Sequence, residues 1–188
     1  MSIIAEILEY NQTFVASRAY ESLRTDRMPN KKLVVLTCMD TRLTELLPRA
    51  MNLANGDAKL IKNAGALVTH PFGSVMRSIL VAVYELNATE ICVVGHHDCG
   101  MAGLSCASMI PKIRAQGISD DVLETLKHAG IDLEKWLVGF AQPRDGVIQS
   151  VEIIRRHPLL PKTLAVHGML MCPDTGKLDC VVDGYAGK

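Results

Sequence analysis

Short apolar runs separated by helical segments place the strongest constraint on the fold of this chain. The runs KKLVVLTC at 31–38 and TEICVVG at 89–95 are continuous and β-branched, and DAKLIKNAGA at 57–66 lies between them. Continuous short runs of this kind are typical of strands buried on both faces of a sheet. The stretch TRLTELLPRAMNL, in which Pro48 predicts a kink or a boundary, and the stretch GSVMRSILVAVYELN at 73–87 are helical in pattern. This alternation predicts an α/β fold whose mostly parallel central sheet is flanked by helices.

The second half of the chain extends the same pattern and ends in a hairpin. Residues 101–140 predict helical segments broken at 117–119 and near Gly130, and residues 144–158 form an amphipathic segment. The runs TLAVHGMLM and LDCVVDGY flank CPDTGK, whose turn-forming residues predict a C-terminal hairpin. No repeat or linker divides the chain, so we expect a single domain over residues 1–188.

The apolar pattern within residues 1–25 predicts an N-terminal helical arm over this range. Six apolar side chains between residues 3 and 15 fall on one helical stripe: Ile3, Ile4, Ile7, Leu8, Phe14 and Val15. A stripe of this size would be an unusually large exposed patch on a monomer, so we expect an oligomer, most simply a dimer. The segment has no basic start, and two glutamates interrupt it, so it does not resemble a signal peptide. The sequence therefore predicts a cytoplasmic protein.

The charge balance excludes several classes of partner. Lys and Arg together number 20, as do Asp and Glu, so the formal net charge is zero. A nucleic-acid surface or a polybasic membrane anchor would require a basic excess, and we expect neither partner. No stretch approaches the ~20 apolar residues that span a bilayer. Cysteines of a cytoplasmic chain are reduced, so the six here are expected to be ligands, core residues or free thiols.

Cysteine and histidine side chains follow two of the predicted strands. Cys38 ends the first run, while His96 and Cys99 follow the third in VVGHHDCGM. The carboxyl ends of parallel strands meet at one edge of a sheet, where α/β proteins bind ligands. Two thiolates and an imidazole suit zinc and leave a fourth position for water. The H-x-x-C spacing favours His96 over His97 as the ligand, and His97 is expected to be exposed or to relay protons.

Other side chains near these strands have simpler interpretations. Taken alone, Asp40 is typical of a helix N-cap and Arg42 of a solvated charge. Their positions two and four residues after Cys38 would nevertheless project them toward the same site. Four further cysteines are expected to be small core residues: Cys92, Cys106, Cys172 and Cys180.

Together these motifs resemble the β-class carbonic anhydrases. That family combines C-x-D-x-R, here CMDTR at 38–42, with H-x-x-C about sixty residues later, here HHDC at 96–99. The resemblance continues through NAGA at 63–66 and VHGMLMCPDTGKL at 166–178, and spans residues 33–183. Lys62 departs from the arginine of many relatives.

The resemblance implies a β-carbonic anhydrase-like fold, a Zn²⁺ cofactor, and the reversible hydration of carbon dioxide to bicarbonate and a proton. It further implies that Cys38, His96 and Cys99 bind zinc, with Asp40 a fourth ligand only in a closed form. Asp40 would orient the attacking water and Arg42 would hold Asp40. The expected assembly is a homodimer or a multiple of dimers.

Substrate contacts and alternative functions remain open at this point. Gly65 and Ala66, at the end of the second strand, are candidates for the wall that contacts the substrate. One alternative function is the hydrolysis of carbon disulfide or carbonyl sulfide on the same scaffold. The other is a non-catalytic zinc-binding module in which Asp40 closes the site permanently.

Overall fold

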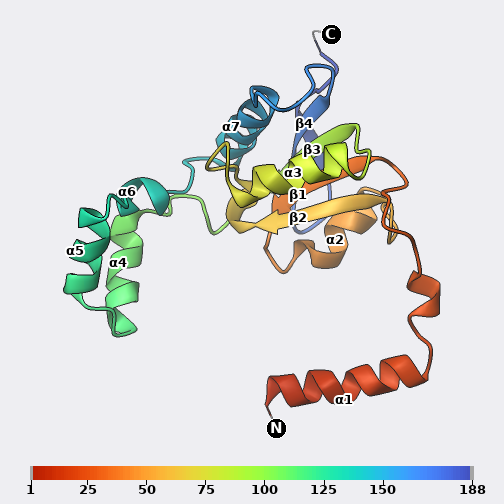
Figure 1. The fold of residues 1–188 in the computed structure, drawn as a ribbon, viewed down its shortest axis with the longest axis horizontal. Coiled ribbons are helices and arrows are strands. Elements are labelled where there is room, and N and C mark those ends of the chain that lie inside the picture. Colours follow the sequence, from red (N-terminus) through yellow and green to blue (C-terminus); the bar gives the residue numbers. More distant parts are fainter. Residues whose placement is uncertain (1, 187–188) are drawn as a thin grey trace.

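A computed structural model describes residues 2–186 of the chain as a five-stranded sheet with helices on both faces and two outlying helical parts (Figure 1). The strands are β1 (Leu33–Cys38), β2 (Ala58–Asn63), β3 (Glu90–His96), β4 (Ala165–Met171) and β5 (Leu178–Val182). The α-helices are α1 (Ile3–Ala16), α2 (Leu43–Ala50), α3 (Ser74–Tyr84), α4 (Cys106–Ala115), α5 (Asp120–His128), α6 (Leu133–Trp136) and α7 (Pro143–Arg155). Two short 3₁₀ turns cover Glu21–Leu23 and Ala64–Ala66.

The sheet confirms the predicted fold class. Its strand order is β2-β1-β3-β4-β5, and the first four strands in this order run parallel. Strand β5 pairs antiparallel with β4, as expected for the C-terminal hairpin. Strand β1 therefore lies between β2 and β3, so the carboxyl ends of three strands that are far apart in sequence lie side by side.

Both faces of the sheet are covered, which explains the continuous apolar runs. Helices α3 and α7 pack on one face against a cluster that includes Val34, Leu36 and Val93. Helix α2 packs on the other face, where Leu43 and Leu47 contact the side of the sheet that carries Val35. Because successive residues of a strand point to opposite faces, nearly every position of such a strand is apolar.

Pro48 lies inside α2 and does not end it, since the helix continues to Ala50. A proline in the second turn of a helix removes one backbone hydrogen bond, and α2 has only eight residues. Of the two alternatives predicted at Pro48, the boundary is wrong and the kink stays a prediction. Across residues 2–186, no helix combines the length and apolar character that crossing a bilayer requires.

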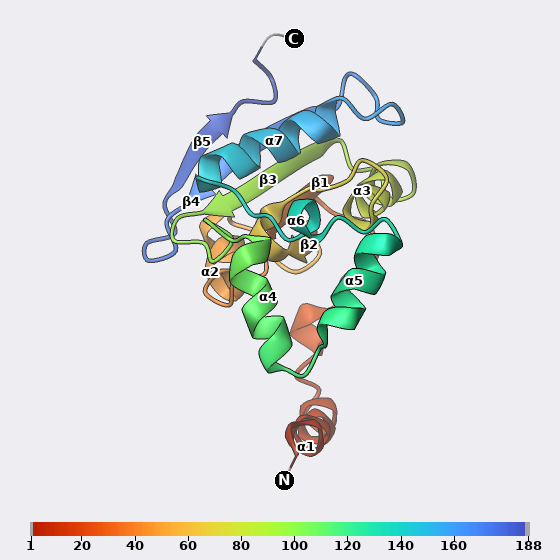
Figure 2. The ribbon, with the colours of Figure 1, turned by 90° about the vertical axis from the view of Figure 1, so that its left-hand side faces the viewer.

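Two helical parts lie apart from the sheet: Figure 1 shows the separation of both, and Figure 2 shows that of α1 again. Helix α1 covers Ile3–Ala16 within the arm predicted for residues 1–25, and it buries none of its residues. Helices α4, α5 and α6 form what we call the helical lobe, residues 106–136, and none of the three buries a residue either. The lobe joins the sheet through a narrow neck in which Gly103 donates to Phe140 and Gly139 donates to Leu104.

Candidate metal centre

The ends of β1 and β3 bring the three predicted metal ligands together. The two strands pair in parallel with Thr37 opposite Val94, so Cys38 at the end of β1 lies beside the end of β3, where His96 is the last strand residue and Cys99 follows in the loop. One ligand atom from each of the three residues lies within 4.8 Å of the others, and all three residues are buried. The two sulfur atoms are 3.8 Å apart. The structure thus assembles the triad that the motifs predicted.

Two glycines permit this close assembly. A side chain at Gly95 would place its Cβ 2.7 Å from the Val147 side chain of α7, so the residue before the ligand loop must be small. Gly65 has a φ of +78°, which favours glycine, and its backbone N–H donates to the Cys38 sulfur at 3.4 Å. The glycine turn after β2 therefore supports the thiolate of Cys38.

His96 is oriented so that one ring nitrogen remains available. Its Nδ1 lies 2.8 Å from the carbonyl oxygen of His97, which requires Nδ1 to carry the proton. Its Nε2 is buried and has no hydrogen-bond partner among residues 2–186. An unpaired buried nitrogen is costly unless a metal takes the lone pair. His97 supplies this carbonyl while its own side chain is exposed, which agrees with His96 as the ligand.

The two thiols differ in acidity because their surroundings differ. Burial alone would raise the pKa of Cys38, but the imidazole of His96 and the backbone N–H groups of Asp40 and Gly65 lower it from 9.0 to about 7. Burial and the neighbouring Cys38 sulfur raise the pKa of Cys99 to about 11. Without a cation, two thiolates at this distance repel each other, so only one ionises readily.

A zinc ion fits this donor set. A bound dication removes the repulsion between the thiolates and keeps both deprotonated. It also satisfies the free Nε2 of His96. Two soft sulfurs and one imidazole are ligands that zinc prefers, and three protein ligands leave one position for a small molecule.

Asp40 and Arg42 form a two-point ion pair beside the triad. Arg42 donates from Nε to Asp40 Oδ1 at 3.1 Å and from Nη2 to Oδ2 at 2.8 Å. The hydrogen bonds and charge of Arg42 lower the pKa of Asp40 from 3.8 to about 2. Asp40 Oδ2 is also 3.7 Å from the free Nε2 of His96. The carboxylate is therefore ionised, held by Arg42, and next to the metal-binding atoms.

Asp98 also contacts Arg42, and the sequence motifs did not predict this contact. Arg42 donates from Nη1 to the Asp98 carboxylate at 3.0 Å and from Nη2 to the Asp98 carbonyl oxygen at 2.9 Å. The residue lies between His96 and Cys99 in the sequence. An aspartate inside H-x-x-C is visible in the sequence, but the strand pairing that brings it to Arg42 is not.

A cavity of about 680 Å³ opens beside the triad. Its lining includes both cysteine ligands, the segment from Met39 to Arg42, Ala64, Gly65, and the neck residues Met101 and Leu104. Gly65 lines this cavity, and its contact with the substrate stays a prediction. Ala66 is fully buried and is not among the lining residues; Ala64 takes that place.

The remaining cysteines do not share one environment. Cys92 is buried, as expected for a core residue. Cys106 and Cys172 are partly exposed and Cys180 is exposed, so the prediction of a core position was wrong for these three. Strand β5 forms the edge of the sheet, and its side chains are at most partly covered.

Comparison with known proteins finds relatives along nearly the whole chain. The family profile described as "Carbonic anhydrase" matches residues 33–178. The Bacillus subtilis protein YtiB, whose name assigns it provisionally to the carbonic anhydrases, is 57% identical over 185 residues, covering 98% of this chain and 99% of its own. A carbon disulfide hydrolase from Acidithiobacillus thiooxidans is 30% identical over 157 residues, covering 79% of this chain and 76% of its own.

A solved structure is similar at the level of the whole fold. The crystal structure of β-carbonic anhydrase isoform I from Trichomonas vaginalis matches with a TM-score of 0.90 and 35% sequence identity. The match covers 98% of this chain and 100% of the other.

Proposed function

Since this chain belongs to the β-class carbonic anhydrase family and carries a Cys-His-Cys zinc-site triad, we propose that Asp40, held by Arg42, orients water for attack on carbon dioxide. The reaction is the reversible hydration of carbon dioxide to bicarbonate and a proton. The observation that carries the proposal is the two-point ion pair, which holds the carboxylate on Arg42 while its Oδ2 stays 3.7 Å from His96 Nε2.

The cofactor supplies one chemical property. When bound by Cys38, His96 and Cys99, zinc acidifies a water molecule so that its deprotonated form is available near neutral pH. The side chains around it determine how that water is oriented.

Asp40 is suited to accept a hydrogen bond from the attacking water. Its pKa of about 2 keeps the carboxylate ionised at every pH at which the protein would work. An ionised carboxylate accepts hydrogen bonds and donates none, so it fixes the direction of a neighbouring O–H. Arg42 occupies the carboxylate from the other side, which leaves Asp40 free to orient water and keeps it from binding the metal itself.

The cavity wall is suited to a small apolar substrate. Carbon dioxide carries no charge and needs a dry surface more than a hydrogen-bond donor. Met39, Gly65, Met101 and Leu104 supply such a surface next to the triad. We assign Gly65 to the substrate wall on this basis.

The direct test combines catalysis with metal analysis. Purified protein is expected to hold close to one zinc per chain and to hydrate carbon dioxide, and Asp40→Asn is expected to keep zinc while losing most of its activity. A variant with full zinc and undiminished hydration would remove Asp40 from the mechanism.

Carbon disulfide and carbonyl sulfide are tested in the same assay. The same attacking water could reach their carbon atoms, and one relative is named for carbon disulfide hydrolysis. The higher identity to YtiB over nearly the whole chain supports carbon dioxide as the substrate. Faster turnover of a sulfur compound than of carbon dioxide would reverse this assignment.

Helix α1 supports an assembly of at least two copies. Its apolar side chains are strongly exposed, among them Ile3 at 67%, Ile4 at 61% and Leu8 at 59%. Burying such side chains stabilises an interface by about 25 cal/mol per Å², so a second copy is the simplest cover for them. We expect sedimentation to give a dimer or a multiple of dimers, and Leu8→Glu to weaken it. A stable, active wild-type monomer at micromolar concentration would contradict this.

A further inference from the structure

The Arg42 side chain connects the two loops that carry the metal ligands. On one side it binds Asp40, two residues after Cys38, and on the other it binds Asp98, one residue before Cys99. Four guanidinium hydrogen bonds are thereby used, two on each side. Asp40 alone would leave the guanidinium free to turn about its side-chain bonds together with the carboxylate, because both residues belong to the same loop.

We propose that Asp98 is a positioning residue, which holds Arg42 against the ligand loop so that Asp40 stays paired with Arg42 and off the metal. The proposal rests on the role assigned above to Asp40. Asp98 accepts hydrogen bonds from Arg42 and is not among the residues that line the substrate cavity, so we assign its action to Arg42.

The backbone at Asp98 makes this double contact possible. Asp98 has a φ of +52°, a left-handed conformation that aspartate and asparagine tolerate better than other non-glycine residues. In this conformation both its carbonyl oxygen and its carboxylate reach the same guanidinium. The Asp98 side chain is 85% exposed, so solvent weakens its ion pair with Arg42. We therefore expect substitution of Asp98 to have a moderate effect on the position of Arg42.

Three residues at position 98 separate positioning from a purely structural role. Glycine adopts the left-handed conformation most easily but offers no side chain. Asparagine keeps the conformation and one oxygen acceptor but removes the charge. If position 98 only shapes the loop, the fraction of zinc that is open to water in Asp98→Gly will equal or exceed that in the wild type. If Asp98 positions Arg42, the fraction of zinc that is open to water will be highest with Asp at position 98, lower with Asn and lowest with Gly.

The readout is the zinc coordination itself, measured by X-ray absorption and by crystallography at matched pH. We expect the ratio of zinc bound by the Asp40 carboxylate to zinc open to water to rise about three- to tenfold in Asp98→Gly, and less in Asp98→Asn. The kcat should fall by a similar factor, with KM nearly unchanged. In metal-free protein, the NMR signal of the Arg42 Nε–H should exchange with solvent faster in Asp98→Gly than in the wild type.

Glu45→Gln is the matched control. It removes another exposed carboxylate paired with an arginine, Arg49, on α2, and should leave the zinc coordination unchanged. Wild-type coordination and Nε–H exchange in Asp98→Gly would overturn the proposal. Absence of carbon dioxide hydration by the wild type would instead count against the proposed function, because the coordination comparison does not depend on turnover.

Discussion

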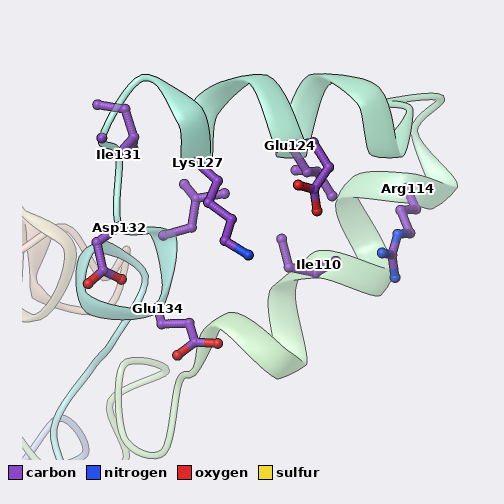
Figure 3. Close-up of a pocket in the computed structure, with 10 residues that line it drawn as sticks. Ile110, Arg114, Glu124, Lys127, Ile131, Asp132 and Glu134 are labelled. Carbon is purple, nitrogen blue, oxygen red and sulfur yellow. The ribbon is translucent and has the colours of Figure 1, made fainter.

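The ligand loops and the helical lobe each border a cavity of similar size, yet they are built differently. The cavity beside the triad measures about 680 Å³ and the one between α4, α5 and α6 about 620 Å³. The metal site has three buried ligands, two constrained glycines beside them, and an arginine that makes four side-chain hydrogen bonds. The lobe buries no residue, and Figure 3 shows Glu124 and Lys127 of α5 pointing toward Ile110 of α4 across an open space. Cavity size therefore does not indicate which of the two regions contains the catalytic residues.

The largest expected effect distinguishes two cysteines, one from each region. Cys99→Ser should lose most of its zinc and more than about a hundredfold of its activity, because a hard oxygen replaces a soft thiolate poorly. Cys106→Ser, at the start of the lobe, should keep both. Elemental analysis and hydration rates check this pair. Stoichiometric zinc in Cys99→Ser would refute the ligand assignment.

The second prediction concerns Arg42. Arg42→Ala should keep its zinc but lose about a hundredfold in hydration rate, the order of loss expected when a catalytic group is misplaced. Without the guanidinium, the Asp40 carboxylate is free to bind the metal. Crystal structures or X-ray absorption should show a closed site at every pH tested.

In the wild type, acidification should favour the closed site as well. The pKa of Asp40 lies near 2, so the carboxylate remains ionised, while hydroxide, which competes with it for the metal, becomes scarcer. Activity should therefore rise from neutral toward mildly alkaline pH. An open site in Arg42→Ala with wild-type rates would remove Arg42 from the mechanism.

The sequence was sufficient to predict the zinc ligands because these residues stand at or just after the ends of predicted strands. The spacing of Cys38, His96 and Cys99, together with the expectation of parallel strands, was sufficient to place the three ligands at one edge. Asp98 and Met101 were not assigned roles, because their contacts depend on strand register and on how the neck returns to the sheet. A single sequence does not encode such contacts as a local pattern.

The lobe was predicted as helices and no further. The breaks at 117–119 and near Gly130 match the gaps between α4, α5 and α6. Their arrangement does not follow from an apolar stripe, because none of the three helices packs on the sheet with a buried residue. Ala66 is a similar case beside the site: it is fully buried, and it is not among the residues that line the cavity with Gly65.

The third prediction uses metal-free protein. Because His96 and two backbone N–H groups lower the pKa of Cys38 to about 7, one thiol of the pair should ionise near neutral pH. Taken alone, a Cys38 pKa below the unfolded value of 9.0 contributes stability that is fully present above pH 9.0 and disappears as pH falls through 7. Rates of thiol alkylation and unfolding midpoints against pH measure both effects. Cys38→Ser should abolish the near-neutral step, whereas Cys106→Ser should not.

The smallest effect is expected in the lobe. Lys127 and Glu134 line its cavity but lie on helices without buried residues. Their exposed side chains contribute little to folding, so Lys127→Gln and Glu134→Gln should change the free energy of unfolding by less than about 0.5 kcal/mol. The neck joins the lobe to the triad cavity through Met101 and Leu104, and substitutions at the far cavity leave those backbone contacts intact. Hydration rates and zinc content should therefore equal those of the wild type. A loss of more than about threefold in hydration rate, with zinc retained, would be larger than such a small change in the free energy of unfolding can explain. It would mean that the lobe, despite its open packing, sets the position of the neck and with it the wall of the catalytic cavity.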